Sequence, residues 1–220
     1  MMPIDNNELK RLLTEMKKTH IAGEREGYNE AVRTQRFIRL LHDWALNQLK
    51  KVGIGEDDKI KILTETKVPG YFKLKNVDIL VLHEIAGPIL ILSVKSLMSS
   101  ITNNFTNTYE GMIGDVIGLH ERYPYLMMCH LFLMPKEVLK REETYPINYY
   151  ARLLGKINGR KDETDDVKKY ERIGLLLVDF KKDTPEVVSN IPMDKNLRIE
   201  NYFDDIALLY KDRMIWAETK

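Results

Sequence analysis

Cysteine is almost absent from this 220-residue sequence, since Cys129 is the only one. A lone cysteine excludes an internal disulfide and a cysteine-rich zinc site. Long apolar runs are also missing: the longest, 125–134, covers ten positions and includes His130, whereas a membrane-spanning helix needs roughly 20. The first residues lack the basic and then apolar pattern of a secretory signal peptide. These absences predict a protein of a reducing cytoplasm that has no membrane partner.

Charge of one sign is not in excess either, because 34 basic and 33 acidic residues leave a net charge of +1. The basic residues nevertheless gather in two stretches, 8–51 and 136–161. That distribution suits either a groove that follows phosphates or two solvated helix faces. Neither Gly-x-x-x-x-Gly-Lys nor Gly-x-Gly-x-x-Gly occurs, so no nucleotide cofactor is expected.

The sequence does have an ordinary globular composition, 44% hydrophobic and 30% charged, with a hydrophobic period that changes along the chain. Apolar residues at helical spacing predict helices over 9–16, 28–52 and 108–121, and further helices near 148–157, 163–170 and 201–210. Alternating or aliphatic runs predict strands over 59–68, 77–83, 89–95, 126–134 and 173–180. No repeat or linker divides the chain, so we expect a single domain over residues 1–220.

The order of these elements predicts the fold class. Three strands joined by the short turns at 69–70 and 86–88 are typical of an antiparallel meander. The strand at 126–134 follows a helical crossover, so it should run parallel to the third strand. We therefore expect an α/β fold with a mixed central sheet flanked by helices, in the order helix, three-stranded meander, helix, strand.

Two charged side chains interrupt the apolar faces of neighbouring strands. By strand alternation Asp78 shares a face with Leu80, and Lys95 shares a face with Ser93 and Ile91. Burying a charge is costly unless it is paired or bound to a metal. Paired strands lie about 4.8 Å apart, so Asp78 and Lys95 are expected to be cross-strand neighbours. The pair fits a catalytic site, and equally a plain ion pair at the rim of the sheet.

Two helical glutamates are expected beside this pair. Glu30 precedes Phe37 by seven residues, which directs it toward the sheet or makes it a residue that stabilises the start of the helix. Glu110 precedes Ile113 by three residues and so borders the apolar stripe of its helix.

Asp78, a short hairpin, Ser93-Val94-Lys95 at the end of an aliphatic strand and a following helix resemble the core of the PD-(D/E)xK nucleases. Type II restriction endonucleases and several repair nucleases have that fold. The resemblance covers about residues 25–135 and leaves 136–220 as a C-terminal elaboration of a single nuclease-like domain.

The sequence departs from the pattern of this family at two positions. Val77 stands where the pattern has proline, and Ser93 stands where it has an acid. One group of restriction endonucleases is similar in having Ser-x-Lys with the acid moved to the following helix, and Glu110 fits that place. Asp115, Glu65 and Glu84 are the other acids that could take the role.

The resemblance implies a Mg²⁺-dependent DNA endonuclease, most like a type II restriction enzyme that cuts a specific duplex site. Asp78 and Glu110 would hold Mg²⁺, with the carbonyl of Val94 as a further ligand, because this ion prefers hard oxygen donors. Lys95 would orient or deprotonate the attacking water, or hold the phosphate. Glu30 would support the site from behind or bind a second ion.

The resemblance also implies double-stranded DNA as the partner, a homodimer for a palindromic target, and the cytoplasm of a prokaryotic cell. The residues expected to contact DNA are Arg152, Lys156, Arg160 and Lys161, together with Asn104 from a polar loop at 103–107. The alternatives are a DNA repair or junction-resolving nuclease with the same core, a catalytically inactive nuclease-like DNA-binding module, and an α/β protein of another function.

Overall fold

The computed structural model describes residues 6–26, 35–98, 101–136, 147–188, 192 and 194–218. Its helices are α1 (Asn6–Glu26), α3 (Gln35–Lys51), α4 (Ile101–His120), α5 (Ile147–Lys156) and α6 (Tyr202–Glu218), with a short 3₁₀ helix, η2, at Lys195–Leu197. Its strands are β1 (Ile60–Pro69), β2 (Leu74–His83), β3 (Gly87–Ser96), β4 (Met127–Pro135), β5 (Arg172–Asp179) and β6 (Glu186–Val187).

The strands form one six-stranded mixed sheet in the order β1-β2-β3-β4-β5-β6. The first three strands pair antiparallel, and β4 lies parallel to β3, as the sequence predicts. Beyond them β5 is parallel to β4, and the two-residue β6 closes the order antiparallel to β5. Strand β3 is therefore central, which agrees with its buried aliphatic run from Ile89 to Leu92.

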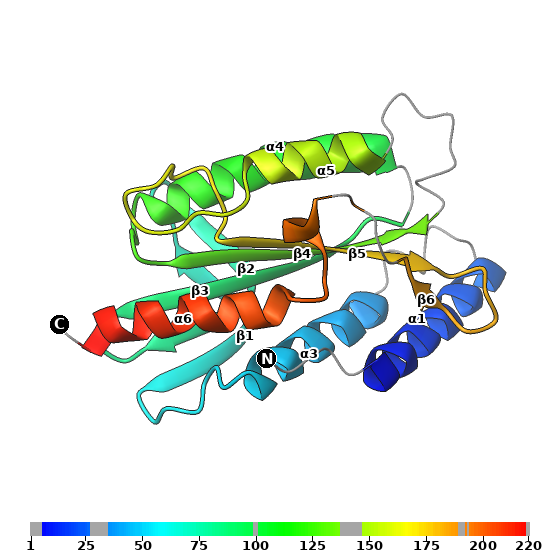
Figure 1. Cartoon of the computed structure of the whole chain (residues 1–220), viewed down its shortest axis with the longest axis horizontal. Helices are drawn as coiled ribbons and strands as arrows, with labels where there is room; N and C mark the ends of the chain where they lie inside the picture. The colour runs from blue at the N-terminus through cyan, green and yellow to red at the C-terminus, as the bar shows by residue number, and fades with distance from the viewer. Residues whose placement is uncertain are drawn as a thin grey trace.

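Helices cover both faces of the sheet (Figure 1). Helices α4 and α5 lie on one face, where a cluster of buried residues includes Phe105, Val116 and Leu154. Helices α1, α3 and α6 lie on the other face, where the cluster includes Leu13 and Leu41. The structure is thus an α/β fold in three layers, and none of its described helices is long and apolar enough to span a bilayer.

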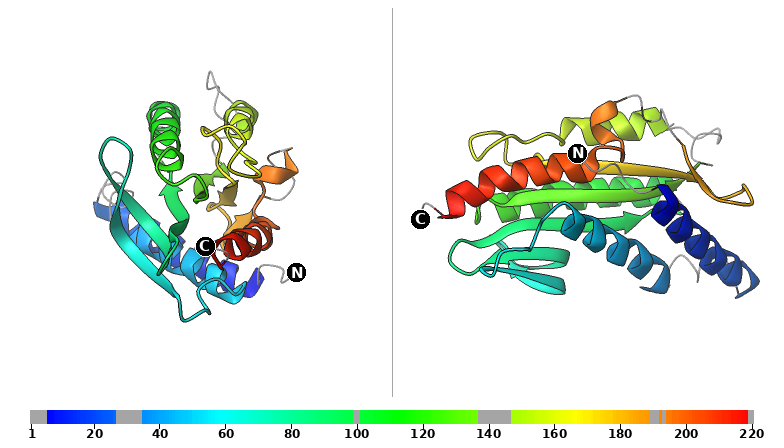
Figure 2. Two further views of the ribbon diagram at one scale, coloured as in Figure 1. Left: turned by 90° about the vertical axis from the view of Figure 1, so that its left-hand side faces the viewer. Right: turned by 60° about the horizontal axis from the view of Figure 1, so that its bottom comes forward.

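The β1–β2 hairpin departs from the plane of the other strands. In the left view of Figure 2 it rises beside α4, and the backbone N–H of Tyr71 in its turn donates to the carbonyl of Gly118 in that helix at 2.8 Å.

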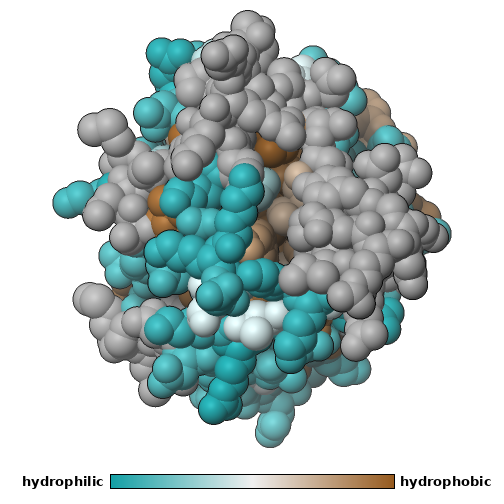
Figure 3. All heavy atoms as spheres, turned by 90° about the vertical axis from the view of Figure 1, so that its right-hand side faces the viewer, coloured by the Kyte–Doolittle hydropathy of each residue, from teal (hydrophilic) through white to brown (hydrophobic). Residues whose placement is uncertain are grey.

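At the end of the sheet where β4 and β5 finish, Lys136 Nζ binds Asp179 Oδ2 at 2.8 Å. Figure 3 shows the molecule from the right-hand side of Figure 1, with hydrophobic residues visible between hydrophilic ones near the centre.

Two segments differ in kind from the sequence predictions. Helix α4 begins at Ile101, so residues 103–107 belong to a helix rather than to a polar loop, because Ile101 and Phe105 extend its buried stripe by about two turns. Residues 163–170 form turns in place of the predicted helix. Asp162 and Asp166 there accept hydrogen bonds from the backbone N–H groups two residues later, and such turns compete with helix formation.

Candidate functional site

The sheet opens between β2 and β3 at the row that contains Asp78. Hydrogen-bonded pairing of these strands extends from His83 and Gly87 to Ile79 and Leu92 and then stops. Beyond that row β2 remains paired with β1, and β3 remains paired with β4. The two halves of the sheet therefore separate at this row, and polar groups of both strands become accessible in the gap.

The carboxylate of Asp78 lies in this gap and joins the two strands. Its Oδ2 accepts a hydrogen bond of 2.7 Å from the backbone N–H of Val94, a donor that a regular ladder would give to a β2 carbonyl. Its Oδ1 lies 3.9 Å from Nε2 of His42, which comes from α3. The Asp78 side chain is 33% exposed, so the carboxylate is positioned by protein groups while remaining accessible to solvent.

The strand partner of Asp78 on its other side is Glu65. The β1–β2 register pairs Thr64 with Ile79 and Thr66 with Val77. Glu65 therefore lies opposite Asp78, although these two residues are not themselves a regular ladder pair. Glu65 has φ 46°, and among the described residues it is the only one besides glycine with a positive φ. Its side chain is exposed. Strained backbone of this kind is often found at functional sites.

Lys95 directly follows Val94, whose N–H binds Asp78, and its side chain is exposed. Lys95 lies opposite Phe132 in the β3–β4 register, and Ser93 lies opposite His130. Burial, and next the positive charge of Lys95, lower the pKa of His130 to about 3. The ammonium group of Lys95 is thus close enough to the buried imidazole to oppose its protonation.

Strict strand alternation does not hold at Asp78. Leu80 and Ile91 pack beneath α4 as expected, but Val77 packs there too, although Ile79 faces the opposite cluster. The chain therefore rotates between Val77 and Ile79, and Asp78 reaches His42 of α3 rather than lying flat on the α4 face.

The two candidate acids on α4, Glu110 and Asp115, have different surroundings. Glu110 is exposed, because the buried side of α4 consists of Phe105, Met112 and Val116; it does not face the sheet. Asp115 forms an ion pair with Lys75 of β2 and is occupied by it.

The remaining acids are placed by their strands. Glu84 lies in the turn after β2, six residues beyond Asp78 and past the end of that strand. Glu30 lies outside the described residues. Glu65 is therefore the predicted alternative that the strand register brings next to Asp78.

Four of the predicted DNA contacts are on the surface. Arg152 and Lys156 are exposed on α5, where the guanidinium of Arg152 lies 5.6 Å from the ring centroid of Tyr149. Lys161 is exposed, and its backbone N–H donates to Asp165. Asn104 is exposed too, on α4 instead of a loop.

Arg160 requires a correction, because its side chain is buried. It is 1% exposed and donates to Oε1 of Glu171 at 3.0 Å. Arg213 of α6 binds the same oxygen at 3.3 Å, while the other carboxylate oxygen accepts from the N–H of Met128 at 2.7 Å. These partners neutralise a fully buried carboxylate, so Arg160 stabilises the fold and is not available to a phosphate.

Sequence reasoning did not identify His42 or the Glu171 cluster. For His42 a signal exists, since it lies four residues after Ile38 and three before Ala45, along the buried stripe of α3. No short-range pattern predicts that Glu171 and Arg213 meet, because they are 42 residues apart.

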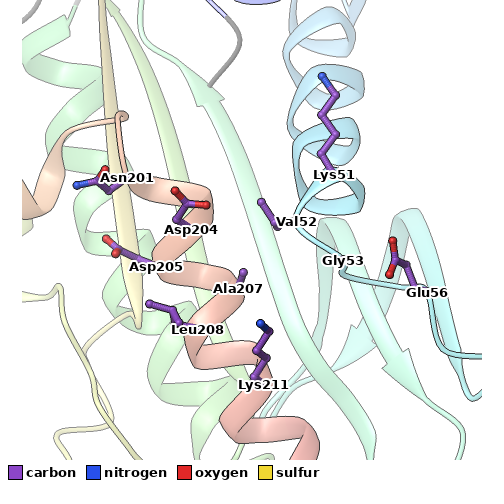
Figure 4. Close-up of a pocket in the computed structure, with 10 residues that line it drawn as sticks. All are labelled: Lys51, Val52, Gly53, Glu56, Asn201, Asp204, Asp205, Ala207, Leu208 and Lys211. Atoms are coloured by element: carbon purple, nitrogen blue, oxygen red, sulfur yellow. The ribbon is translucent and has the colours of Figure 1, made fainter. Parts of the chain in front are cut away.

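A separate pocket of about 500 Å³ lies between the end of α3 and α6 (Figure 4). Its charged residues are Lys51, Glu56, Asp204, Asp205 and Lys211. Among them, Lys51 binds Glu8 and Asp205 binds Arg172. None of the candidate nuclease residues lines this pocket.

The donors around Asp78 suit Mg²⁺. This ion is commonly held by one or two carboxylates and keeps several waters, and Asp78 offers a positioned, accessible carboxylate with Glu65 as its strand neighbour. Among the described side chains, no three from His, Cys, Asp or Glu come together as a ready-made ligand cluster. A cation at Asp78 would therefore need further oxygen ligands from outside the protein.

The chain was compared with known proteins in three ways. No protein-family model matches it, and neither a curated protein nor a solved structure is similar to it.

Proposed function

We propose that the protein is a Mg²⁺-dependent DNA endonuclease, most like a type II restriction enzyme that cuts a specific duplex site. One observation carries the proposal: Asp78 is the first residue of β2 beyond its pairing with β3, and its carboxylate binds the N–H of Val94, the residue before Lys95, within a meander followed by a parallel strand. The fixed carboxylate and the exposed lysine would together supply the polar groups of a site at this opening.

The residues of the site would divide the chemistry among them. Asp78 holds the cation, and Lys95 orients or deprotonates the attacking water or holds the scissile phosphate. When bound, Mg²⁺ neutralises charge on the phosphate and lowers the pKa of a bound water. His42, whose Nε2 lies 3.9 Å from Asp78 Oδ1, would support the carboxylate from the α3 side.

The second acid of the site remains a choice between two residues. Glu110 fits the family arrangement by sequence, but its side chain is exposed on the outer side of α4. Glu65 is the strand neighbour of Asp78 and has the strained backbone. We favour Glu65 on this ground.

Phosphate contacts are proposed for Arg152, Lys156 and Lys161, which are exposed and basic. A homodimer, in which each subunit cuts one strand of a palindromic site, is the assembly that such an enzyme requires.

Cleavage of plasmid DNA with and without Mg²⁺ tests the proposal. We expect wild-type protein to cut, and Lys95→Ala and Asp78→Asn to lose cleavage by at least about 100-fold, since each removes a group that acts in the transition state. Lys211→Ala, which removes an exposed lysine on α6, is the matched control and should cut normally. Full cutting by Lys95→Ala would remove the assignment of the site.

The substrate separates the related functions. Discrete fragments from plasmid DNA favour a restriction enzyme, whereas preferential cutting of branched or damaged DNA favours a repair or junction-resolving nuclease. Titration calorimetry with Mn²⁺ or Ca²⁺ addresses the third possibility, because an inactive DNA-binding module should bind neither ion.

A further inference from the structure

The turn between β1 and β2 exposes three large apolar side chains. Tyr71 is 60% exposed, Phe72 86% and Leu74 61%. They lie within four residues of one another, at the turn and the first residue of β2, whereas most large apolar residues of the sheet are below 9% exposed. Contiguous exposed apolar residues of this size usually mark an interaction site.

This turn is held in one conformation. The N–H of Gly70 donates to the carbonyl of Lys73 at 2.9 Å, and the N–H of Tyr71 donates to Gly118 of α4 at 2.8 Å. A Cβ at position 70 would lie 2.9 Å from the Lys73 carbonyl, so the closed turn requires glycine there. The rings of Tyr71 and Phe72 meet edge to face at 4.8 Å. A fixed aromatic pair loses little entropy when it binds a partner.

The charges around the turn favour an anionic partner. Lys67, Lys73 and Arg122 are exposed, and Arg122 also donates to the Gly70 carbonyl. No acid occurs between residues 66 and 77. The nearby acids include Asp115, which is paired with Lys75, and the exposed Glu121 and Glu65, of which Glu65 lies two residues before Lys67.

We propose that Tyr71 and Phe72 stack on unstacked bases of a DNA strand whose phosphates are held by Lys67, Lys73 and Arg122. Exposed aromatic rings among basic side chains are the combination by which proteins bind single strands and distorted duplexes, since every base has a face for stacking. This inference rests on the proposed function and deepens it: the DNA bound at the site would have one or more bases unstacked next to the position that is cut.

The position of the turn relates it to the candidate catalytic site. Strand β2 leads from Leu74 to Asp78, four residues on, which corresponds to about 13 Å at roughly 3.3 Å per residue. Stacked bases are about 3.4 Å apart along a strand. A stacked strand that contacts both places would therefore have about four nucleotides between the stacked base and the scissile phosphate.

Fluorescence of 2-aminopurine tests the stacking directly. Single-stranded and mismatch-containing oligonucleotides carry the probe at successive positions and are bound without divalent ions. We expect quenching by wild-type protein, loss of quenching with Phe72→Ala, and about tenfold weaker binding of these oligonucleotides. Phe72→Leu should bind as weakly as Phe72→Ala, because it keeps an apolar side chain without a π-face. Ile85→Ala is the matched control, since Ile85 is 70% exposed in the turn after β2.

The outcomes distinguish this inference from the proposed function. If wild-type protein binds and cuts DNA while Phe72→Ala binds every oligonucleotide equally well, the stacking site is refuted and the nuclease stands. If Phe72→Ala changes only the sedimentation of the protein, the turn is a contact between two copies of the chain and the inference is likewise refuted. If Lys95→Ala cuts as well as wild type, the nuclease assignment fails, and quenching that depends on Phe72 would still support base stacking.

Discussion

Glu65 carries strain that a single substitution can release. A non-glycine residue in the left-handed region costs roughly 1–2 kcal/mol, and Glu65 has φ 46°. We expect Glu65→Gly to raise the free energy of unfolding by about 1 kcal/mol in urea denaturation, whereas Glu65→Gln should leave it nearly unchanged.

The same two variants test Glu65 as a metal ligand. If Glu65 is the second acid, both variants bind Mn²⁺ at least about tenfold more weakly. Unchanged Mn²⁺ binding by both variants would rule out Glu65 as the second acid.

His130 makes the stability of the fold depend on pH. Its pKa falls to about 3 in the folded protein, through burial first and the charge of Lys95 second, and is near 6.5 in the unfolded chain. The unfolded state therefore binds the proton more readily, and stability that is complete above pH 6.5 is lost as the pH falls toward 3. At pH 5 this loss amounts to about 2 kcal/mol.

Urea denaturation at pH 7 and pH 5 measures this loss. We expect His130→Gln to lose about 2 kcal/mol less than wild type between the two values. Lys95→Met should also lose less, since removing the lysine charge raises the pKa of His130. Equal losses in all three proteins would show that His130 does not titrate in this way.

The residue scale is also where sequence reasoning is least complete. Alternation correctly predicts that Leu80 and Ile91 share a face, because both lie where β2 and β3 are paired. It does not predict that Asp78 turns toward His42, since that depends on where the pairing ends. The burial of Arg160 depends on Glu171 and Arg213, which no local pattern connects to it.

At the scale of elements, the packing of α6 on the sheet depends on the absence of one side chain. A Cβ at Gly174 in β5 would lie 2.7 Å from the ring of Tyr202, the first residue of α6. Tyr202 is fully buried and packs edge to face on Phe203, so its ring has little room to move. Gly174 is therefore a position where the helix and the sheet approach most closely.

Gly174→Ala tests this contact. We expect it to lower the free energy of unfolding by about 1–3 kcal/mol, the usual cost of overpacking. Gly111→Ala is the control: nothing lies within 4 Å of a Cβ there, and alanine should raise the stability of α4 by about 0.5–1 kcal/mol. If both variants were stabilised alike, the close approach of Tyr202 would be ruled out.

The elements themselves are well predicted where the hydrophobic period is strong. The sequence places β1 to β5, α3 and α5 to within a few residues in the described chain. It misses about the first two turns of α4, where Asn103 to Asn107 suggest a loop although Phe105 is buried. It also predicts a helix over 163–170, where aspartates close turns instead. Polar side chains are the common cause, because they suit turns and helix starts alike.

At the scale of the whole molecule, the layers follow from the order of the elements. A helical crossover between β3 and β4 requires parallel strands, and the buried runs of β4 and β5 require helices on both sides. The sequence gives this α/β architecture. It does not give the opening of the sheet between β2 and β3, because that depends on how the β1–β2 hairpin turns toward α4.

Strand β1 ends the sheet order, so one of its sides has no neighbouring strand in the described chain. A straight unpaired edge of ten residues invites addition of a strand from another molecule, which is a route to aggregation. The left-handed residue in the middle of β1 interrupts that edge, and Lys61 and Lys67 place like charges on either side of it. The irregularity at Glu65 would thereby reduce aggregation at high protein concentration, because a strand of another chain could not pair along the whole of β1.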